Sequence, residues 1–148
     1  MSTVLLTGST GFIGSSLITY LEENSPKSLN DILVLSSVQH PKLKTILYDV
    51  NSFILSEIID VTSVIHLGAF IPKNNIEVND IERCTSNITF TKNLLNTLPT
   101  TIDKFIFIST TDVYKKINLI NEDSIVEPAG LYGWSKLSRV LICFCRAF

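Results

Sequence analysis

The chain has 148 residues, 45% of them hydrophobic and 18% charged, and a formal net charge of -2 at pH 7. This composition is typical of one globular domain that buries a core. The lysines and arginines are scattered, so no basic surface for a nucleic acid or an anionic membrane is expected. No membrane-spanning run and no secretory leader are recognisable, which favours a cytoplasmic protein.

Five short runs rich in Val, Ile and Leu are typical of strands that are buried on both faces, as parallel strands are. They lie at residues 3–7, 32–36, 45–50, 63–68 and 104–109. Apolar residues recur at helical spacing in segments 12–24, 80–98 and 131–148, with a weaker helical segment at 52–60. The alternation of strand and helix predicts an α/β fold with a doubly wound parallel sheet of about five strands.

The stretch TGSTGFIG joins the first predicted strand to the first predicted helix and contains Gly8, Gly11 and Gly14. The first N–H groups of a helix have no intrahelical partner, and glycine lets a pyrophosphate approach them closely. A tight turn that needs glycine only for backbone freedom is the alternative. The position in the first strand-helix unit favours nucleotide binding.

Three cysteines and two histidines show no metal or disulfide pattern. Cys84, Cys143 and Cys145 are odd in number, and the close pair has no histidine or further cysteine beside it. We therefore expect three reduced, buried cysteines, no disulfide framework and no metal site. His40 and His66 are far apart in the sequence, and each is expected to be structural.

The spacing T-G-x-x-G-x-x-G resembles the signature of the short-chain dehydrogenase/reductase superfamily, in its extended NAD-dependent epimerase/dehydratase branch. Further similar segments follow in the family's order: YDV, VIHLGA, SNITFTKNLL, FISTTDVY and YGWSK. Together they span almost the whole chain. The resemblance implies a Rossmann-type fold, with residues 1–148 as one NAD(P)-binding domain truncated before the family's substrate-binding C-terminal region.

Tyr132 and Lys136 lie four residues apart at the start of the last predicted helix, so they share one face. A nearby ammonium can lower the pKa of the phenol, which would make Tyr132 an acid/base; coincidental spacing on a surface is the alternative. The resemblance implies that Thr110, or the adjacent Ser109, orients the substrate oxygen, although these hydroxyls also suit a strand end. In the implied mechanism Tyr132 removes a hydroxyl proton as hydride passes to the nicotinamide, and Lys136 also binds the nicotinamide ribose.

The resemblance also implies cofactor contacts in four places. Backbone N–H groups of Phe12 and Ile13 would face the pyrophosphate, Asp49 and Val50 would border the adenine, Leu67, Gly68 and Ala69 would lie near the ribose, and Asn87 would lie near the active site. For Asp49 a strand-end turn is an equally simple explanation, and for Ala69 close packing is. The predicted cofactor site therefore includes residues outside the glycine loop.

Cofactor choice stays open between NAD and NADP. The second predicted strand ends in Ser36 and Ser37, where an acid would usually bind the ribose hydroxyls of NAD. Lys42 and Lys44 are near in sequence, so we expect NADP to be tolerated at least as well as NAD. Asp49 is the other acid that could act on the ribose.

The expected activity is that of a nucleotide-sugar epimerase, dehydratase or reductase that acts by hydride transfer. The alternatives are a non-catalytic dinucleotide-binding module and an inactive fragment. The expected partners are a dinucleotide and a nucleotide sugar. Self-association as a homodimer or larger species is expected from the strand at 104–109, as a sheet edge, and from the apolar last helix.

Overall fold

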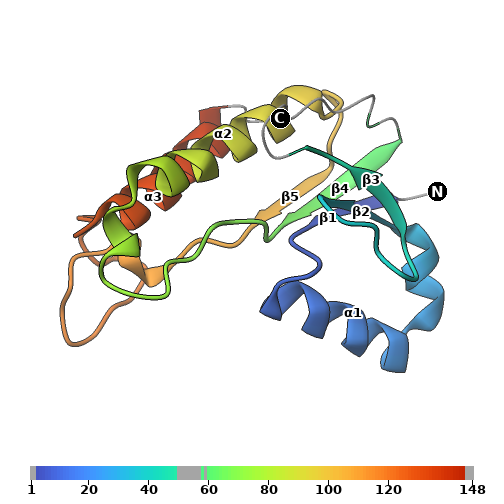
Figure 1. Cartoon of the computed structure of the whole chain (residues 1–148), viewed down its shortest axis with the longest axis horizontal. Helices are drawn as coiled ribbons and strands as arrows, with labels where there is room; N and C mark the ends of the chain where they lie inside the picture. Colours follow the sequence, from blue (N-terminus) through green and yellow to red (C-terminus); the bar gives the residue numbers. More distant parts are fainter. Residues whose placement is uncertain (1–2, 50–57, 59, 146–148) are drawn as a thin grey trace. The chain divides into compact units, whose positions relative to one another are not determined.

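The computed structural model describes residues 3–49, 58 and 60–145. Its strands are β1 (Thr3–Thr7), β2 (Ile32–Ser36), β3 (Lys44–Leu47), β4 (Val61–His66) and β5 (Lys104–Phe107). Its α-helices are α1 (Phe12–Asn24), α2 (Ile81–Thr97) and α3 (Leu131–Cys145), and its short 3-10 helices are η1 (Pro26–Asp31), η2 (Glu77–Asn79) and η3 (Thr111–Val113). Figure 1 labels the strands and α-helices.

The five strands form one parallel sheet in the order β3-β2-β1-β4-β5. From the central β1 the chain builds outward through β2 and β3, then returns to add β4 and β5 on the other side. Because all the strands are parallel, their carboxyl ends lie at one edge, and ligands bind such sheets where the strand order reverses. The sheet confirms the Rossmann-type fold that the sequence predicts.

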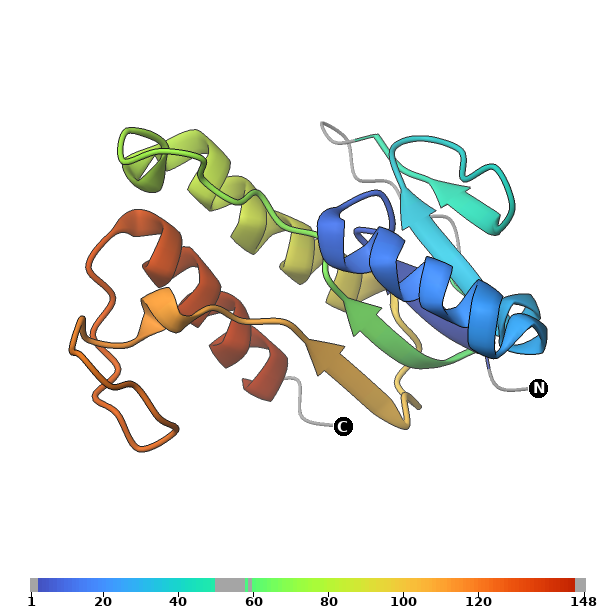
Figure 2. The ribbon, with the colours of Figure 1, turned by 90° about the horizontal axis from the view of Figure 1, so that it is seen from below.

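The chain divides into two units, and the first contains the sheet, α1 and η1: residues up to Gly68 together with Asn96–Ile108. Ile18 of α1 packs into a cluster of buried side chains from the strands and the loop before β3: Leu6, Ile32, Val34 and Leu43. Figure 2 shows α1 lying across one face of the sheet. Burying each such side chain stabilises the fold by about 1.5–3 kcal/mol.

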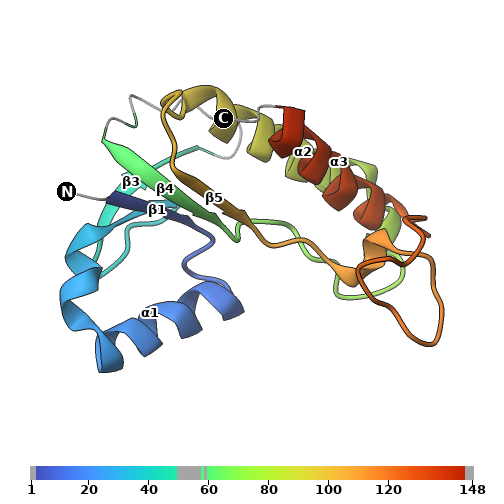
Figure 3. The same ribbon diagram turned by 180° about the vertical axis from the view of Figure 1, so that it is seen from behind.

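The second unit contains Ala69–Leu95 and, of the described residues, those from Ser109 to Cys145. Here α2 and α3 lie side by side (Figures 1 and 3). The start of α3 lies against η3, because a Cβ at Gly133 would lie 2.4 Å from the backbone oxygen of Asp112. Glycine at this position therefore lets η3 and α3 come together.

The predicted elements match the observed ones closely, with shifts at strand ends. β1, β2 and α1 have the expected bounds, whereas β4 begins at Val61 and β5 ends at Phe107. The helix predicted at 52–60 falls largely outside the described residues, as does Val50. The expectation of three buried cysteines was wrong: Cys84 is buried, but Cys143 is half-buried and Cys145 is exposed near the end of α3.

Candidate functional site

The glycine loop between β1 and α1 is folded tightly onto itself. Gly8 has φ +75°, and a Cβ there would lie 2.6 Å from the backbone nitrogen of Gly68. A Cβ at Gly14 would lie 2.2 Å from the carbonyl oxygen of Gly8, which also accepts a hydrogen bond from the Gly11 N–H at 3.1 Å. Glycine is therefore required at positions 8 and 14 by space, and at position 8 also by backbone conformation.

The loop delivers the amino end of α1 to the carboxyl edge of the sheet. Gly11 is the N-cap residue, in an extended conformation, and provides no side-chain cap. The side chains of Phe12 and Ile13 are exposed, and the first turn contains no acidic residue. The first N–H groups of a helix lack intrahelical partners and carry its positive dipole end. This end of α1 suits an anion such as a diphosphate.

A buried hydrogen-bonded group underlies the glycine loop. The Thr7 hydroxyl oxygen accepts from the Gly68 N–H at 3.0 Å and lies 2.7 Å from Nδ1 of His66. His66 is fully buried, and the rings of Phe105 and Phe107 lie 6.1 and 5.8 Å from its own. His66 is thus a structural residue that ties β4 to β1, as the sequence predicts.

The residues predicted to face the adenosine half lie at the same edge of the sheet. Ser36 ends β2, and its hydroxyl oxygen accepts from the Val38 N–H at 3.2 Å. Ser37 is exposed. The Tyr48 N–H donates to the carbonyl oxygen of Ser36 at 3.1 Å, which brings the exposed Asp49 to the end of β3 beside these serines.

The two lysines expected to favour NADP lie elsewhere. Lys44 opens β3 and is in register with Leu33, near the start of β2, so it lies toward the amino edge of the sheet. Lys42 precedes it, and its ammonium nitrogen lies 2.7 Å from a carboxylate oxygen of Glu22 on α1. The argument for NADP from these lysines was therefore wrong. Nearness in sequence suggested that they lie beside Ser36, but the strand register places them toward the opposite edge of the sheet.

The second unit brings together the predicted acid–base residues. Tyr132 and Lys136 are both buried on α3. The Thr110 hydroxyl is close enough to Tyr132 to lower the pKa of its phenol. The Thr110 hydroxyl also accepts from the Asp112 N–H at 3.3 Å and lies 3.3 Å from its carboxylate. Thr110 therefore caps η3, which is the structural role considered for this hydroxyl, and it lies near the phenol of Tyr132.

The electrostatics of this set differ from the expectation. Burial and then the charge of Asp112 raise the pKa of Tyr132, while the Thr110 hydrogen bond and the charge of Arg139 lower it by less. Burial and the charge of Arg139 lower the pKa of Lys136 to about 7. The expectation that Lys136 lowers the phenol pKa was wrong: the cation that acts on Tyr132 is Arg139, and the phenol pKa is raised overall.

Asn87, predicted near the active site, organises the backbone of the second unit. Its side-chain oxygen accepts from the Phe70 N–H at 2.7 Å, and its Nδ2 donates to the Phe70 carbonyl at 3.1 Å and to the Ser135 hydroxyl at 3.4 Å. Ser135 in turn donates to the Tyr132 carbonyl at 2.7 Å. Asn87 thus links the segment after Ala69 to the first turn of α3; Leu67, Gly68 and Ala69 are themselves half-buried.

Sequence reasoning missed Arg139, Thr91 and Asp112, which all contribute to this set. Arg139 and Thr91 are fully buried and hydrogen-bonded to each other, and Asp112 acts on the phenol from η3. No spacing rule points to Thr91 or Asp112, and a charged helical residue such as Arg139 is ordinarily assigned to the solvent face. The helical position of Arg139, on the face of Tyr132 and Lys136, was the one available signal.

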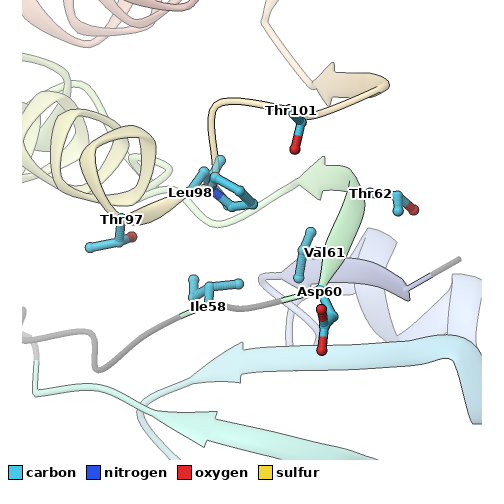
Figure 4. Close-up of a pocket in the computed structure, with 8 residues that line it drawn as sticks. Ile58, Asp60, Val61, Thr62, Thr97, Leu98 and Thr101 are labelled. Atoms are coloured by element: carbon cyan, nitrogen blue, oxygen red, sulfur yellow. The ribbon is translucent and has the colours of Figure 1, made fainter. Parts of the chain in front are cut away.

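A pocket of about 620 Å³ lies in the first unit (Figure 4). It is lined by Ile58, Asp60, Val61, Thr62, Thr97, Leu98, Pro99 and Thr101. Val61 opens β4, so the pocket lies toward the amino edge of the sheet, and none of the predicted site residues lines it.

The described residues contain neither a group of metal-ligating side chains nor a helix that could cross a membrane. Within residues 3–49, 58 and 60–145, no three His, Cys, Asp or Glu side chains are grouped so that they could hold a metal ion. In the same part of the chain, no helix has the length and apolarity needed to cross a membrane.

The chain is similar to known proteins over most of its length. The family model described as NAD dependent epimerase/dehydratase family matches residues 4–145. The chain belongs to this family. It is 31% identical over 164 residues to dTDP-D-glucose 4,6-dehydratase of Dictyostelium discoideum, a match that covers 90% of the chain and 37% of the relative.

Solved structures agree. A UDP-glucuronic acid 4-epimerase from Bacillus cereus in complex with NAD is 29% identical, with a TM-score of 0.76, and the match covers 97% of this chain and 52% of that one. MoeE5 in complex with UDP-glucose and NAD is 25% identical, with a TM-score of 0.79 and coverage of 99% and 49%. The chain spans about half the length of such proteins or less.

Proposed function

We propose that the chain binds NAD through its glycine loop and contributes Tyr132, Thr110 and Lys136 to hydride-transfer chemistry on a nucleotide sugar. The observation that carries the proposal is the glycine loop, which excludes side chains at positions 8 and 14 beside the uncapped end of α1. Family membership supports it. The relatives named above act on or bind UDP- and dTDP-sugars, which supports this substrate class.

The residues of the loop fit a dinucleotide. The missing Cβ atoms at Gly8 and Gly14 leave backbone at the surface of the turn, and the N–H groups of Phe12 and Ile13 begin α1. A diphosphate accepts hydrogen bonds from such groups and is stabilised by the helix dipole. When bound, NAD supplies the hydride acceptor.

The acid–base residues handle the proton. In this proposal Tyr132 takes the proton of a sugar hydroxyl, and the Thr110 hydroxyl, which lies near the phenol, orients that oxygen. Lys136 holds the nicotinamide ribose. Because the pKa of Lys136 is lowered to about 7, its charge changes around neutral pH, and its ability to donate hydrogen bonds changes with it.

We infer that NAD is preferred over NADP. The carboxylate of Asp49 lies at the edge of the sheet that holds Ser36 and Ser37, whereas Lys42 is paired with Glu22 away from that edge. A carboxylate there accepts hydrogen bonds from ribose hydroxyls and repels a 2'-phosphate. Titration calorimetry should show that NAD binds more tightly than NADP. Asp49→Asn should reduce the difference between the two affinities. Equal affinities in the parent would contradict this inference.

The function is tested in two steps. Calorimetry first measures NAD binding by the folded chain, and absence of binding would refute the proposal. UDP-sugars are then added with NAD, and the absorbance of the reduced nicotinamide is followed. Tyr132→Phe should abolish the reduced species with nearly unchanged NAD affinity, whereas Lys136→Ala should reduce both. Equal reduction by Tyr132→Phe and the parent would identify another residue as the base.

A non-catalytic dinucleotide-binding module is the second candidate. The raised pKa of Tyr132 favours it, because a phenol that retains its proton is a poor general base. NAD binding without any reduced nicotinamide for a panel of UDP- and dTDP-sugars would support this candidate against the enzyme.

A further inference from the structure

Arg139 lies on the same face of α3 as the acid–base residues. It follows Lys136 by three positions and Tyr132 by seven, and residues at these spacings lie above one another on a helix. Tyr132, Lys136 and Arg139 are 5%, 4% and 0% exposed. The buried face of α3 therefore carries a row of three ionisable side chains.

The guanidinium of Arg139 is held in place from the neighbouring helix. Its Nε donates to the hydroxyl oxygen of Thr91 on α2, and the Thr91 hydroxyl donates to the Asn87 carbonyl at 3.3 Å. One turn earlier, Asn87 and Ser135 form a second bond between the helices. Figure 3 shows α2 and α3 running side by side. The tether holds the charge of Arg139 within the helix pair rather than at the surface.

A fixed charge in such a place acts strongly on its neighbours, because the effective dielectric constant is low. The charge of Arg139 lowers the pKa of both Tyr132 and Lys136. Burial lowers the pKa of Arg139 itself to about 10, so it remains charged at neutral pH.

Other ionisable groups also face this row. Asp112 of η3 and Cys84 of α2 raise the pKa of Tyr132, and Cys143 of α3 lies near Arg139. Burial has the largest effect on the pKa of Tyr132; of the two charges beside it, Asp112 raises that pKa and Arg139 lowers it.

We propose that Arg139, rather than Lys136, is the positioning residue that supplies the fixed positive charge of the candidate acid–base set. It favours the ionised phenol of Tyr132 and the neutral amine of Lys136 without contacting substrate. Its relevance to catalysis rests on the proposed function, whereas its effect on the two neighbours does not.

Replacing Arg139 distinguishes a charge effect from a packing effect. Arg139→Met removes the charge and keeps most of the volume. If Arg139 acts by its charge, the titration midpoints of Tyr132 and Lys136 both rise. If it acts only by packing, the variant admits water, which favours both charged forms, so the midpoint of Lys136 rises but that of Tyr132 falls. The direction at Tyr132 therefore decides.

Both midpoints can be measured without cofactor. Lys136 is followed by NMR of isotopically methylated lysines, with Lys136→Arg for assignment, and Tyr132 by the ultraviolet absorbance of tyrosinate, with Tyr132→Phe for assignment. In Arg139→Met we expect each midpoint to rise by about one pH unit or more. Arg139→Gln retains an N–H donor for Thr91 without the charge and should show the same rises, so the test remains if the Met variant does not fold.

Arg83→Met is the matched control, because it makes the same change of charge at an exposed position on α2. It should leave both midpoints unchanged. A Tyr132 midpoint that is unchanged or lower in the Arg139 variants, or that rises equally in Arg83→Met, would overturn the proposal. Failure of NAD binding would refute the proposed function and leave these midpoints unaffected.

Discussion

Helices α1 and α3 bury opposite kinds of side chain. α1 buries Ile18 with its apolar neighbours against the sheet and leaves its amino end open. α3 buries tyrosine, serine, lysine and arginine, and exposes apolar side chains such as Phe144, which is 73% exposed. In α1 the backbone carries the candidate function while the side chains stabilise the fold. In α3 the buried side chains carry the candidate function.

This difference has an energetic consequence. Apolar burial stabilises the first unit, whereas burial of a cation costs free energy unless its hydrogen bonds compensate for the lost hydration. The hydrogen bond from Nε of Arg139 to the Thr91 hydroxyl provides some of that compensation. Substitutions in α1 and α3 should therefore have different effects on stability, ligand binding and association, and four experiments test this.

The largest effect is expected at the backbone site of α1. Gly14→Ala places a Cβ 2.2 Å from the Gly8 carbonyl oxygen, so the loop must move. NAD affinity should fall by about 100-fold or more, which corresponds to about 2.8 kcal/mol. Gly11→Ala is the control, since its Cβ would lie 3.3 Å from the same oxygen, and it should lose far less. Calorimetry that finds parental affinity in Gly14→Ala would show that the loop is not the binding element.

The next effect contrasts the two buried faces by stability. Ile18→Ala leaves a cavity in the first unit and should cost about 2–5 kcal/mol in the free energy of unfolding. Arg139→Met should be close to neutral or stabilising, because an apolar side chain of similar volume needs no hydration. Urea unfolding measures both. Equal destabilisation by the two substitutions would mean that the buried polar face of α3 stabilises the fold as much as the apolar core of the first unit does.

Much of the first unit could be predicted from sequence because its signals are local. Apolar runs mark β1 and β2, and glycine spacing marks the turn into α1, where the structure requires glycine at positions 8 and 14. The misplacement of Lys44 came from strand register, since a parallel partner sets which end of the sheet a residue occupies. Register depends on contacts between distant segments and has no local sequence signal.

The second unit could be predicted only in part. Family resemblance predicts Tyr132, Lys136 and Thr110 as the acid–base set, and Thr110 lies close enough to Tyr132 to affect its pKa. Their titration could not be foreseen, because it depends on burial and on Arg139, whose partner Thr91 lies on another helix. A charged residue in a helical pattern predicts a solvent-facing position, and only tertiary packing reverses that assignment.

A smaller effect is expected from the pH dependence of stability. The pKa of Lys136 is about 7 in the folded chain, against an ordinary value of 10.5. Between these values the unfolded chain holds a proton that the folded chain lacks, so this residue makes stability rise with pH across that window. Below pH 7 Lys136 is charged in both states, and the full cost of burying its ammonium lowers the free energy of unfolding.

Lys136→Met should remove this rise and stabilise the chain most at the acid side of the window. Cys84, Cys143 and Tyr132 have raised pKa values, so they make stability fall at alkaline pH. Because parent and variant both contain these three groups, the difference between their melting temperatures at each pH isolates the contribution of Lys136. A difference that does not change with pH would show that Lys136 titrates normally.

The smallest effect concerns the exposed side of α3. Phe144, Leu141 and Trp134 are exposed there, and β5 lies at one end of the strand order. Exposed apolar groups on one helix favour association with another chain, so we expect self-association at micromolar concentration, detectable by sedimentation velocity under reducing conditions. Phe144→Glu should raise the dissociation constant for self-association by about tenfold or more, equivalent to about 1.4 kcal/mol. Tyr20→Glu, which adds the same charge at an exposed aromatic position of α1, should have little effect. Equal weakening by both would indicate general charge repulsion, and a parent that stays monomeric on concentration would show that the apolar side of α3 makes no such contact.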